Sequence, residues 1–226
     1  MSGGLRFIGA MTMLICIAAC TTTRVVKPIE ENEVQIGLDV GGPFVNEQLL
    51  PLTSVHVAYG LHENLSFFSG LHATTMAFQT IQLDFGWCYQ YRAQEGLLPG
   101  MSVNSVFNPM MSIRSGSFRL YPEITPNFYW DIKDRHLFHL GMSNWLDFTA
   151  GKVEIGEGAF WHPGAQLGYR FEMKRWVLAT EYRLLNFNKS LQIPQATVNT
   201  PVGRGGHGIY FTLNYRIQAK KDEKND

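Results

Sequence analysis

One histidine–serine pair stands out in this 226-residue chain as a candidate for chemistry. His139 and Ser143 lie four residues apart, so on a β-strand both side chains point to the same face. A hydrolytic serine also needs a positioned base and oxyanion donors, and the sequence identifies neither. We therefore expect a protein that is not an enzyme, and we keep a lipid-hydrolysing barrel as a minor alternative.

The histidines offer no recognisable metal site. None of them stands in an HExxH spacing, and His136 and His139 are three apart, which on a strand puts them on opposite faces. We expect no metal and no cofactor. The seven histidines are His56, His62, His72, His136, His139, His162 and His207.

Charged residues recur on one face of the stretches that alternate between apolar and polar side chains. Because acids and arginines are balanced there, we predict that they pair and fill a narrow barrel lumen. The same groups could instead line a solute path or a binding pocket. The predicted lumen network consists of Asp84, Arg119, Glu123, Arg170, Glu181, Arg183 and Arg216, with Asp39 and Asp147 on the same face.

The elements that must position these groups are β-strands, because the apolar period after residue 32 is two. Residues 81–91 show it best: Ile81, Leu83, Phe85 and Trp87 face one way, while the residues between them are small or polar. Soluble strands average five or six residues, whereas tilted membrane-spanning strands need about nine to eleven. Large apolar residues on one face and polar ones on the other are typical of a membrane barrel with a polar lumen.

The same pattern predicts about ten strands, with 8–12 possible. Short turns are expected at residues 62–64, 131–135 and 173–175, and longer links at 41–52, 74–79, 149–159 and 186–206. Such asymmetry is typical of outer-membrane barrels. Three prolines, Pro122, Pro126 and Pro163, fall inside strands and predict bulges or strand ends. The expected strands are residues 34–40, 54–59, 65–71, 81–91, one within 101–114, 118–130, 138–148, 161–171, 176–184 and 209–217.

Composition narrows the classes of function. Lysine plus arginine equals aspartate plus glutamate, so the net charge is zero and a nucleic-acid partner is not expected. Charged residues make up 17% and aromatic residues 13% of the chain, which argues against disorder. Of three cysteines, Cys16 and Cys20 lie near the N-terminus, which leaves Cys88 without a disulfide partner. We expect Cys88 to be a small packed side chain.

The N-terminus has the features of an export signal. Arg6 precedes an apolar run at residues 7–17, which is too short for a spanning helix. The run ends in Ile17-Ala18-Ala19-Cys20, which resembles the lipobox of bacterial lipoproteins. That resemblance implies cleavage before Cys20 and its acylation, and Thr21 after the cysteine implies the outer membrane. The predicted organisation is a signal peptide at 1–19, a tether at 20–32, a barrel at 33–218 and a charged tail at 219–226.

Residues 33–217 resemble small bacterial outer-membrane β-barrels, for example in Gln166-Leu167-Gly168-Tyr169-Arg170-Phe171. The resemblance implies an up-and-down antiparallel transmembrane barrel, outer-membrane lipid as a partner, and a structural, adhesive or solute-passage role. An even strand number puts both termini on the periplasmic side. The alternative is a lipid-tethered, soluble periplasmic barrel that binds an apolar ligand. In that case Phe85, Trp87, Leu167 and Phe211 would pack inside.

Overall fold

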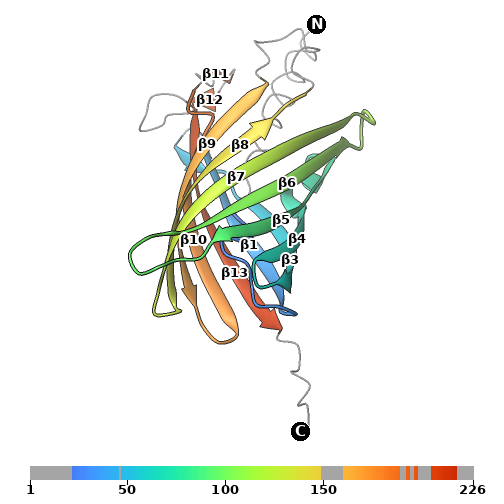
Figure 1. The fold of residues 1–226 in the computed structure, drawn as a ribbon. Coiled ribbons are helices and arrows are strands. Elements are labelled where there is room, and N and C mark those ends of the chain that lie inside the picture. Colours follow the sequence, from blue (N-terminus) through green and yellow to red (C-terminus); the bar gives the residue numbers. More distant parts are fainter. Residues whose placement is uncertain are drawn as a thin grey trace, which may run out of the picture.

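A computed structural model describes residues 22–45, 47–148, 160–188, 192–193, 196–197 and 205–217 of the chain. Within them, a closed antiparallel barrel of ten strands contains nearly all of the regular structure (Figure 1). The described residues include no helix that is long and apolar enough to cross a membrane. The predicted fold class, an all-β up-and-down barrel, is confirmed.

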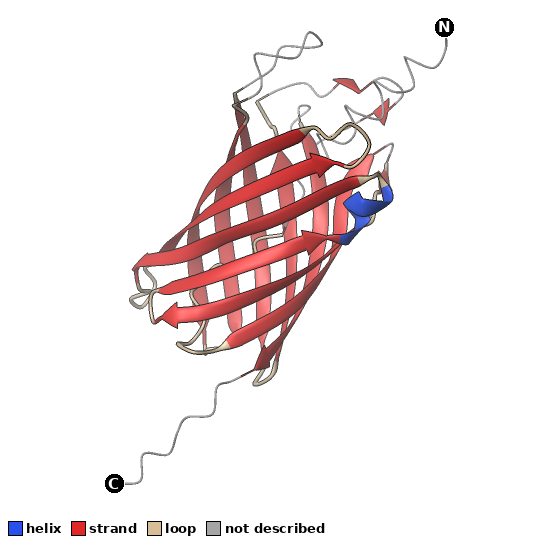
Figure 2. Ribbon diagram, turned by 90° about the vertical axis from the view of Figure 1, so that its right-hand side faces the viewer, coloured by secondary structure: helices blue, strands red, loops and turns tan. Residues whose placement is uncertain are grey.

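Each long strand pairs with its neighbours along the chain, and β13 pairs with β1 to close the barrel. A two-residue strand β2 extends the β1 end, and a short helix α2 lies at the rim (Figure 2). The bounds are β1 (Val34–Val45), β2 (Gln48–Leu49), β3 (Leu52–His62), β4 (Leu65–His72), α2 (Ala73–Ala77), β5 (Thr80–Arg92), β6 (Gly100–Ser112), β7 (Phe118–Ile132), β8 (His136–Leu146), β9 (Trp161–Glu172), β10 (Trp176–Leu185), β11 (Gln192–Ile193), β12 (Ala196–Thr197) and β13 (Gly206–Ile217).

The two ends of the barrel differ in the length of their connections. Residues 63–64, 93–99, 133–135 and 173–175 join strands at one end, the short-turn end. Residues 46–51, 73–79, 113–117, 147–160 and 186–205 join them at the other, the long-loop end. Val34 pairs with Ile217, so β1 begins and β13 ends at the short-turn end. The connection between β6 and β7 is the turn at residues 113–117.

The strands present apolar side chains outward and polar side chains inward. Phe85, Leu167 and Phe211 are 48%, 54% and 55% exposed, whereas Gln82 and Asp84 on the other face of β5 are 0% and 2% exposed. This orientation follows from the period of two, because successive side chains of a strand point to opposite faces. The predicted outward orientation is confirmed, and most of the buried side chains among the described residues are polar.

The prolines inside β7 do not shift the strand register. Phe107 pairs with Pro122 and Val103 with Pro126 in the β6–β7 ladder. In the β7–β8 ladder the pairs at residues 125 and 126 are absent, yet Ile124–Asn144 and Asn127–Gly141 keep the same register. The expectation of bulges or strand ends is therefore wrong for β7. A missing proline N–H removes ladder hydrogen bonds locally, while the pairs on either side hold the alignment.

Candidate functional site

The lumen is occupied by the chain's own residues 22–29, called here the lumen segment. The chain reverses at the short-turn end, where the Asn32 N–H donates to the Gly60 carbonyl (2.8 Å) and the Gly60 N–H donates to the Glu33 carbonyl (3.0 Å). A Cβ on Gly60 would lie 2.0 Å from the Glu30 carbonyl oxygen, so only glycine allows this close approach. The lumen segment therefore lies inside the wall, and its chain runs toward the short-turn end, opposite in direction to β1.

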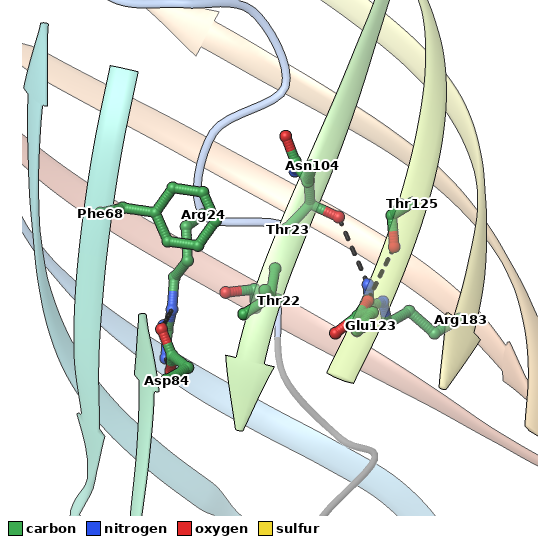
Figure 3. A pocket seen from close by; sticks show the side chains of 10 residues that line it. Thr22, Thr23, Arg24, Phe68, Asp84, Asn104, Glu123, Thr125 and Arg183 are labelled. Atoms are coloured by element: carbon green, nitrogen blue, oxygen red, sulfur yellow. Dashed lines mark hydrogen bonds and ion pairs between the residues drawn. The ribbon is translucent and has the colours of Figure 1, made fainter. Parts of the chain in front are cut away.

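Arg24 is the charged centre of the lumen segment. Its Nη2 donates to Asp84 Oδ2 at 2.7 Å, and its Nε lies 3.4 Å from Asp84 Oδ1 (Figure 3). Its Nη1 contacts Asp39 Oδ2. Arg24, Asp39 and Asp84 are 3%, 3% and 2% exposed. Gly70 leaves room for this arrangement, because a Cβ there would meet Arg24 Nη2 at 2.8 Å. One guanidinium is thus held between two buried carboxylates, from β1 and from β5, which is three strands away around the wall.

Hydroxyl and imidazole groups complete the surroundings of the two carboxylates. Asp39 accepts hydrogen bonds from the Ser54 hydroxyl (2.9 Å) and the Thr212 hydroxyl (2.6 Å). His56 Nδ1 lies 2.9 Å from Asp39 Oδ2, and His72 Nε2 lies 2.9 Å from Asp84 Oδ2. Both imidazoles are buried. The acceptor oxygens are therefore satisfied by fixed partners, which hold the carboxylates ready for a planar cation.

Side chains of the wall bind the main chain of the lumen segment. Arg170 donates to the carbonyls of residues 23 and 24, Asn104 Nδ2 to the Val25 carbonyl (2.8 Å), and Ser102 to the Val26 carbonyl. The N–H groups of residues 23 and 29 donate to Glu181 Oε1 (3.3 Å) and to the Ser66 hydroxyl (3.0 Å). These hydrogen bonds are made to main-chain carbonyl and N–H groups, which every extended peptide has, so they do not depend on the side chains of the segment.

Two small apolar clusters hold the valines of the lumen segment. Val25 packs against Ala58, Phe68, Cys88 and Val106. Val26 packs against Tyr129 and Leu137. Cys88 is fully buried in the first cluster, which agrees with a packed thiol. Two further apolar clusters, around Tyr210 and around Trp145, lie among inward-facing side chains that are mostly polar.

Little space is left around the lumen segment. The cavity that Thr22, Thr23 and Arg24 line together with Asp84, Asn104 and other wall residues measures about 20 Å³ (Figure 3). That is room for about one water molecule. The lumen as described is therefore closed at this level.

The structure places five of the predicted network residues inside the lumen. Asp84, Glu123, Arg170, Glu181 and Arg183 are all at most 6% exposed. Arg183 Nε pairs with Glu181 Oε1 at 2.8 Å, and the Arg183 Nη2 contacts the Thr23 hydroxyl. Asp39 and Asp147 are buried as well.

The other two predicted residues, Arg119 and Arg216, lie half-buried at opposite ends of the barrel. Arg119 donates to the Tyr121 hydroxyl (3.3 Å) at the long-loop end. Arg216 contacts Glu172 and Glu33 at the short-turn end. Burial raises the pKa of Glu33, although the Gln35 hydrogen bond and Arg216 act in the opposite direction.

The His139–Ser143 pair lies inside the lumen, as its spacing predicts, and both residues are buried. His139 Nε2 lies 3.1 Å from Glu181 Oε2, so the ring contacts a carboxylate of the lumen network. Glu181 in turn accepts from the residue 23 N–H and pairs with Arg183. The imidazole is thus part of the surroundings of the lumen segment. Among the described residues no group of three or more His, Cys, Asp or Glu could hold a metal ion.

The lumen segment is the part of the site that the sequence prediction missed. Residues 20–32 were expected to form a tether, whereas residues 22–26 and Pro28 are buried inside the barrel. The physical reason is an excess of acid on the wall, which a cation from outside the strands can balance. Arg24 followed by Val25 and Val26 was the available signal, since a polar tether has no need of adjacent valines. The predicted lipid site Cys20, the signal peptide and the charged tail lie outside the described residues.

No protein-family model and no curated protein matches this chain. Among solved structures, the chain is similar to the translocator domain of autotransporter NalP from Neisseria meningitidis (TM-score 0.46, 11% identity, 95% of this chain and 96% of that one). It is also similar to the KdgM porin (TM-score 0.45, 7% identity, 80% and 98%) and to the attachment invasion locus protein Ail of Yersinia pestis (TM-score 0.30, 11% identity, 83% and 100%). Likenesses this distant carry no argument about function.

Proposed function

We propose that this protein is a lipid-anchored outer-membrane β-barrel for solute passage, and that the lumen segment closes it whenever the segment lies inside the barrel. The observation that carries the proposal is a closed barrel with an apolar outside and a polar lumen, occupied by a segment that joins the wall covalently only through residues 30–33. Such an occupant can leave without unfolding a strand, because its other contacts are side-chain contacts and hydrogen bonds.

The outer surface supports a place in a bilayer. Apolar side chains cover the middle of the strands, and aromatic residues gather toward both ends. Tyr91 and Trp176 lie near the short-turn end, and Trp161, Phe118 and Phe148 near the long-loop end; all are more than 40% exposed. An apolar band between aromatic girdles is the pattern of outer-membrane barrels. In water, the same surface would be a large aggregation-prone patch.

The polar interior argues against two alternative functions, a soluble carrier of apolar ligands and a lipid hydrolase. A soluble carrier of apolar ligands needs an apolar cavity, but the lumen is lined by carboxylates, guanidinium groups and amides. A lipid hydrolase of the barrel type would need its serine near the bilayer, but Ser143 faces the lumen and is 3% exposed. A structural or adhesive role through the long loops is the remaining alternative, and it requires no opening.

Channel recordings test the proposal. In planar bilayers, the unacylated wild-type barrel should conduct weakly, because the lumen is filled. A full-length variant in which residues 22–27 are replaced by glycine and serine should show at least several-fold greater conductance. The matched control is Glu30→Ser with Glu31→Ser, which changes only exposed residues beside the lumen segment. Equal conductance in the wild type and in a folded replacement variant would contradict solute passage and favour the structural or adhesive role.

A further inference from the structure

We propose that the lumen is a binding site for extended peptides that carry an arginine, and that the lumen segment is its built-in occupant. The proposal rests on the proposed function, because it names the class of solute that the opened barrel would take. It goes further, however, since it assigns the recognition to named wall residues.

The first observation is that the wall recognises the peptide backbone in an extended run. Residues 23 to 26 each have a carbonyl or N–H bound by a wall side chain, from Arg170, Glu181, Asn104 and Ser102. These donors and acceptors come from three strands, β6, β9 and β10, so the wall contacts the peptide on more than one side. Donors to consecutive carbonyls have no use in an open water-filled channel, but they suit an extended peptide ligand.

The second observation is the selectivity for arginine. The Arg24 guanidinium lies between Asp39 and Asp84 and is also 2.9 Å from the Ser54 hydroxyl. A planar fork of donors fits this arrangement better than the point charge of a lysine. Without the lumen segment, the buried charged groups of the wall are Asp39, Asp84, Glu123, Asp147 and Glu181 against Arg170 and Arg183. The vacated lumen therefore has an excess of negative charge and favours a cationic occupant.

The third observation is that the site has features that the lumen segment fills only in part. Asn104 Oδ1 is buried and accepts no hydrogen bond from the described residues, although the same amide donates to the Val25 carbonyl. Asn104 lines the small cavity beside Arg24. An acceptor in that position can receive a further N–H from a peptide, which a site shaped for one fixed occupant would not leave unmet.

Peptide block of the opened barrel tests the proposal. The replacement variant of residues 22–27 is reconstituted in planar bilayers, and a capped peptide with the sequence of residues 22–29 is added. We expect block at a concentration at least 10-fold lower than for the same peptide with citrulline in place of arginine. Citrulline keeps the shape of the side chain and removes its charge. In a second barrel that also carries Asp84→Asn, this preference should fall several-fold.

One further ligand separates a peptide site from simple charge attraction. Free arginine should block far more weakly than the peptide, because it lacks the consecutive carbonyl groups that Arg170, Asn104 and Ser102 bind. Equal block by the citrulline peptide or by free arginine would overturn the proposal, even if the variant conducts as the proposed function requires.

Two complications can arise, and each has its own measurement. If the replacement variant folds but does not conduct, fluorescence anisotropy of the labelled peptide in detergent still decides whether the lumen binds it. If that variant does not fold, full-length Arg24→Ala takes its place in both assays. Absence of arginine-dependent peptide binding in a folded barrel refutes the peptide site, whereas absence of conductance refutes only the proposed passage.

Discussion

At the scale of single residues, Arg24 is the group on which the lumen depends most. It is a buried cation whose partners, Asp39 and Asp84, are themselves buried on the wall. Buried ion pairs contribute little over apolar packing, but removal of one partner leaves uncompensated charge and is strongly destabilising. Here the loss of Arg24 would leave two buried carboxylates without their guanidinium partner, with hydroxyl and imidazole groups as their other hydrogen-bond partners.

Arg24→Ala should therefore lower the free energy of unfolding by about 3–5 kcal/mol. If the lumen segment leaves instead, the carboxylates gain water and the loss is smaller, but conductance rises. Arg24→Lys should restore only part of either property, because lysine cannot bind Asp84 through two nitrogens. Urea unfolding in detergent, followed by tryptophan fluorescence, measures the first effect and channel recordings the second.

The control for Arg24 is Lys27→Ala. Lys27 pairs with Asp131 through a side chain that is 39% exposed, so its loss should cost about 1 kcal/mol or less. An Arg24→Ala protein that matches Lys27→Ala in both stability and conductance would show that the buried pairs do not hold the lumen segment.

At the scale of elements, the strands decide which face meets the membrane and which meets the lumen segment. β9 illustrates both roles: Leu167 points outward, while Arg170 reaches inward to the carbonyls of residues 23 and 24. The alternation is a local property of an extended chain, so one strand presents one face to the membrane and the other to the polar lumen. A register slip of one residue would exchange the two faces and fail on both.

Leu167→Arg tests the assignment of the outer face. Leu167 lies near the middle of β9 and is 54% exposed, so an arginine there should cost about 2–4 kcal/mol if it faces the centre of a bilayer. In a barrel surrounded by water the same change should cost almost nothing. Reversible unfolding from lipid vesicles gives the difference, with Leu167→Ala as the matched control. A cost no greater than that of alanine would contradict the membrane assignment.

At the scale of the whole molecule, the position of the lumen segment inside the barrel limits where the proposed lipid anchor at Cys20 can lie. Thr22 donates to Asp39 inside the barrel (2.8 Å), and two extended residues span at most about 7 Å. An acylated Cys20 held in the inner leaflet therefore cannot coexist with Thr22 at this depth. Acylation would favour the withdrawn segment and an open lumen, whereas the unacylated chain would favour the closed one.

This limit predicts that the acylated protein and the Cys20→Ala variant differ in conductance. The acylated barrel should conduct more, and the Cys20→Ala barrel should remain closed. Both should stay with outer membranes after a carbonate wash and migrate faster on a denaturing gel before boiling than after it. Mass spectrometry confirms the acylation state. Identical conductance of the two forms, with acylation verified, would show that anchoring and closure are independent.

The sequence by itself determined the wall of this barrel. Strand number, inward and outward faces and the contrast between short and long connections follow from a period of two and from turn residues, which are local features. The burial of Asp84, Glu123, Arg170, Glu181 and Arg183 follows from the same alternation.

Only the tertiary structure decided what fills the lumen. Arg24 and Asp84 are 60 residues apart, and Arg170 is 146 residues from Arg24, whose carbonyl it binds. Such pairs are set when closure of the β1–β13 seam creates an enclosed, acidic interior that no single strand possesses. A ten-stranded barrel leaves space along its axis for one extended segment, and the nearest cation with apolar neighbours in the chain occupies it.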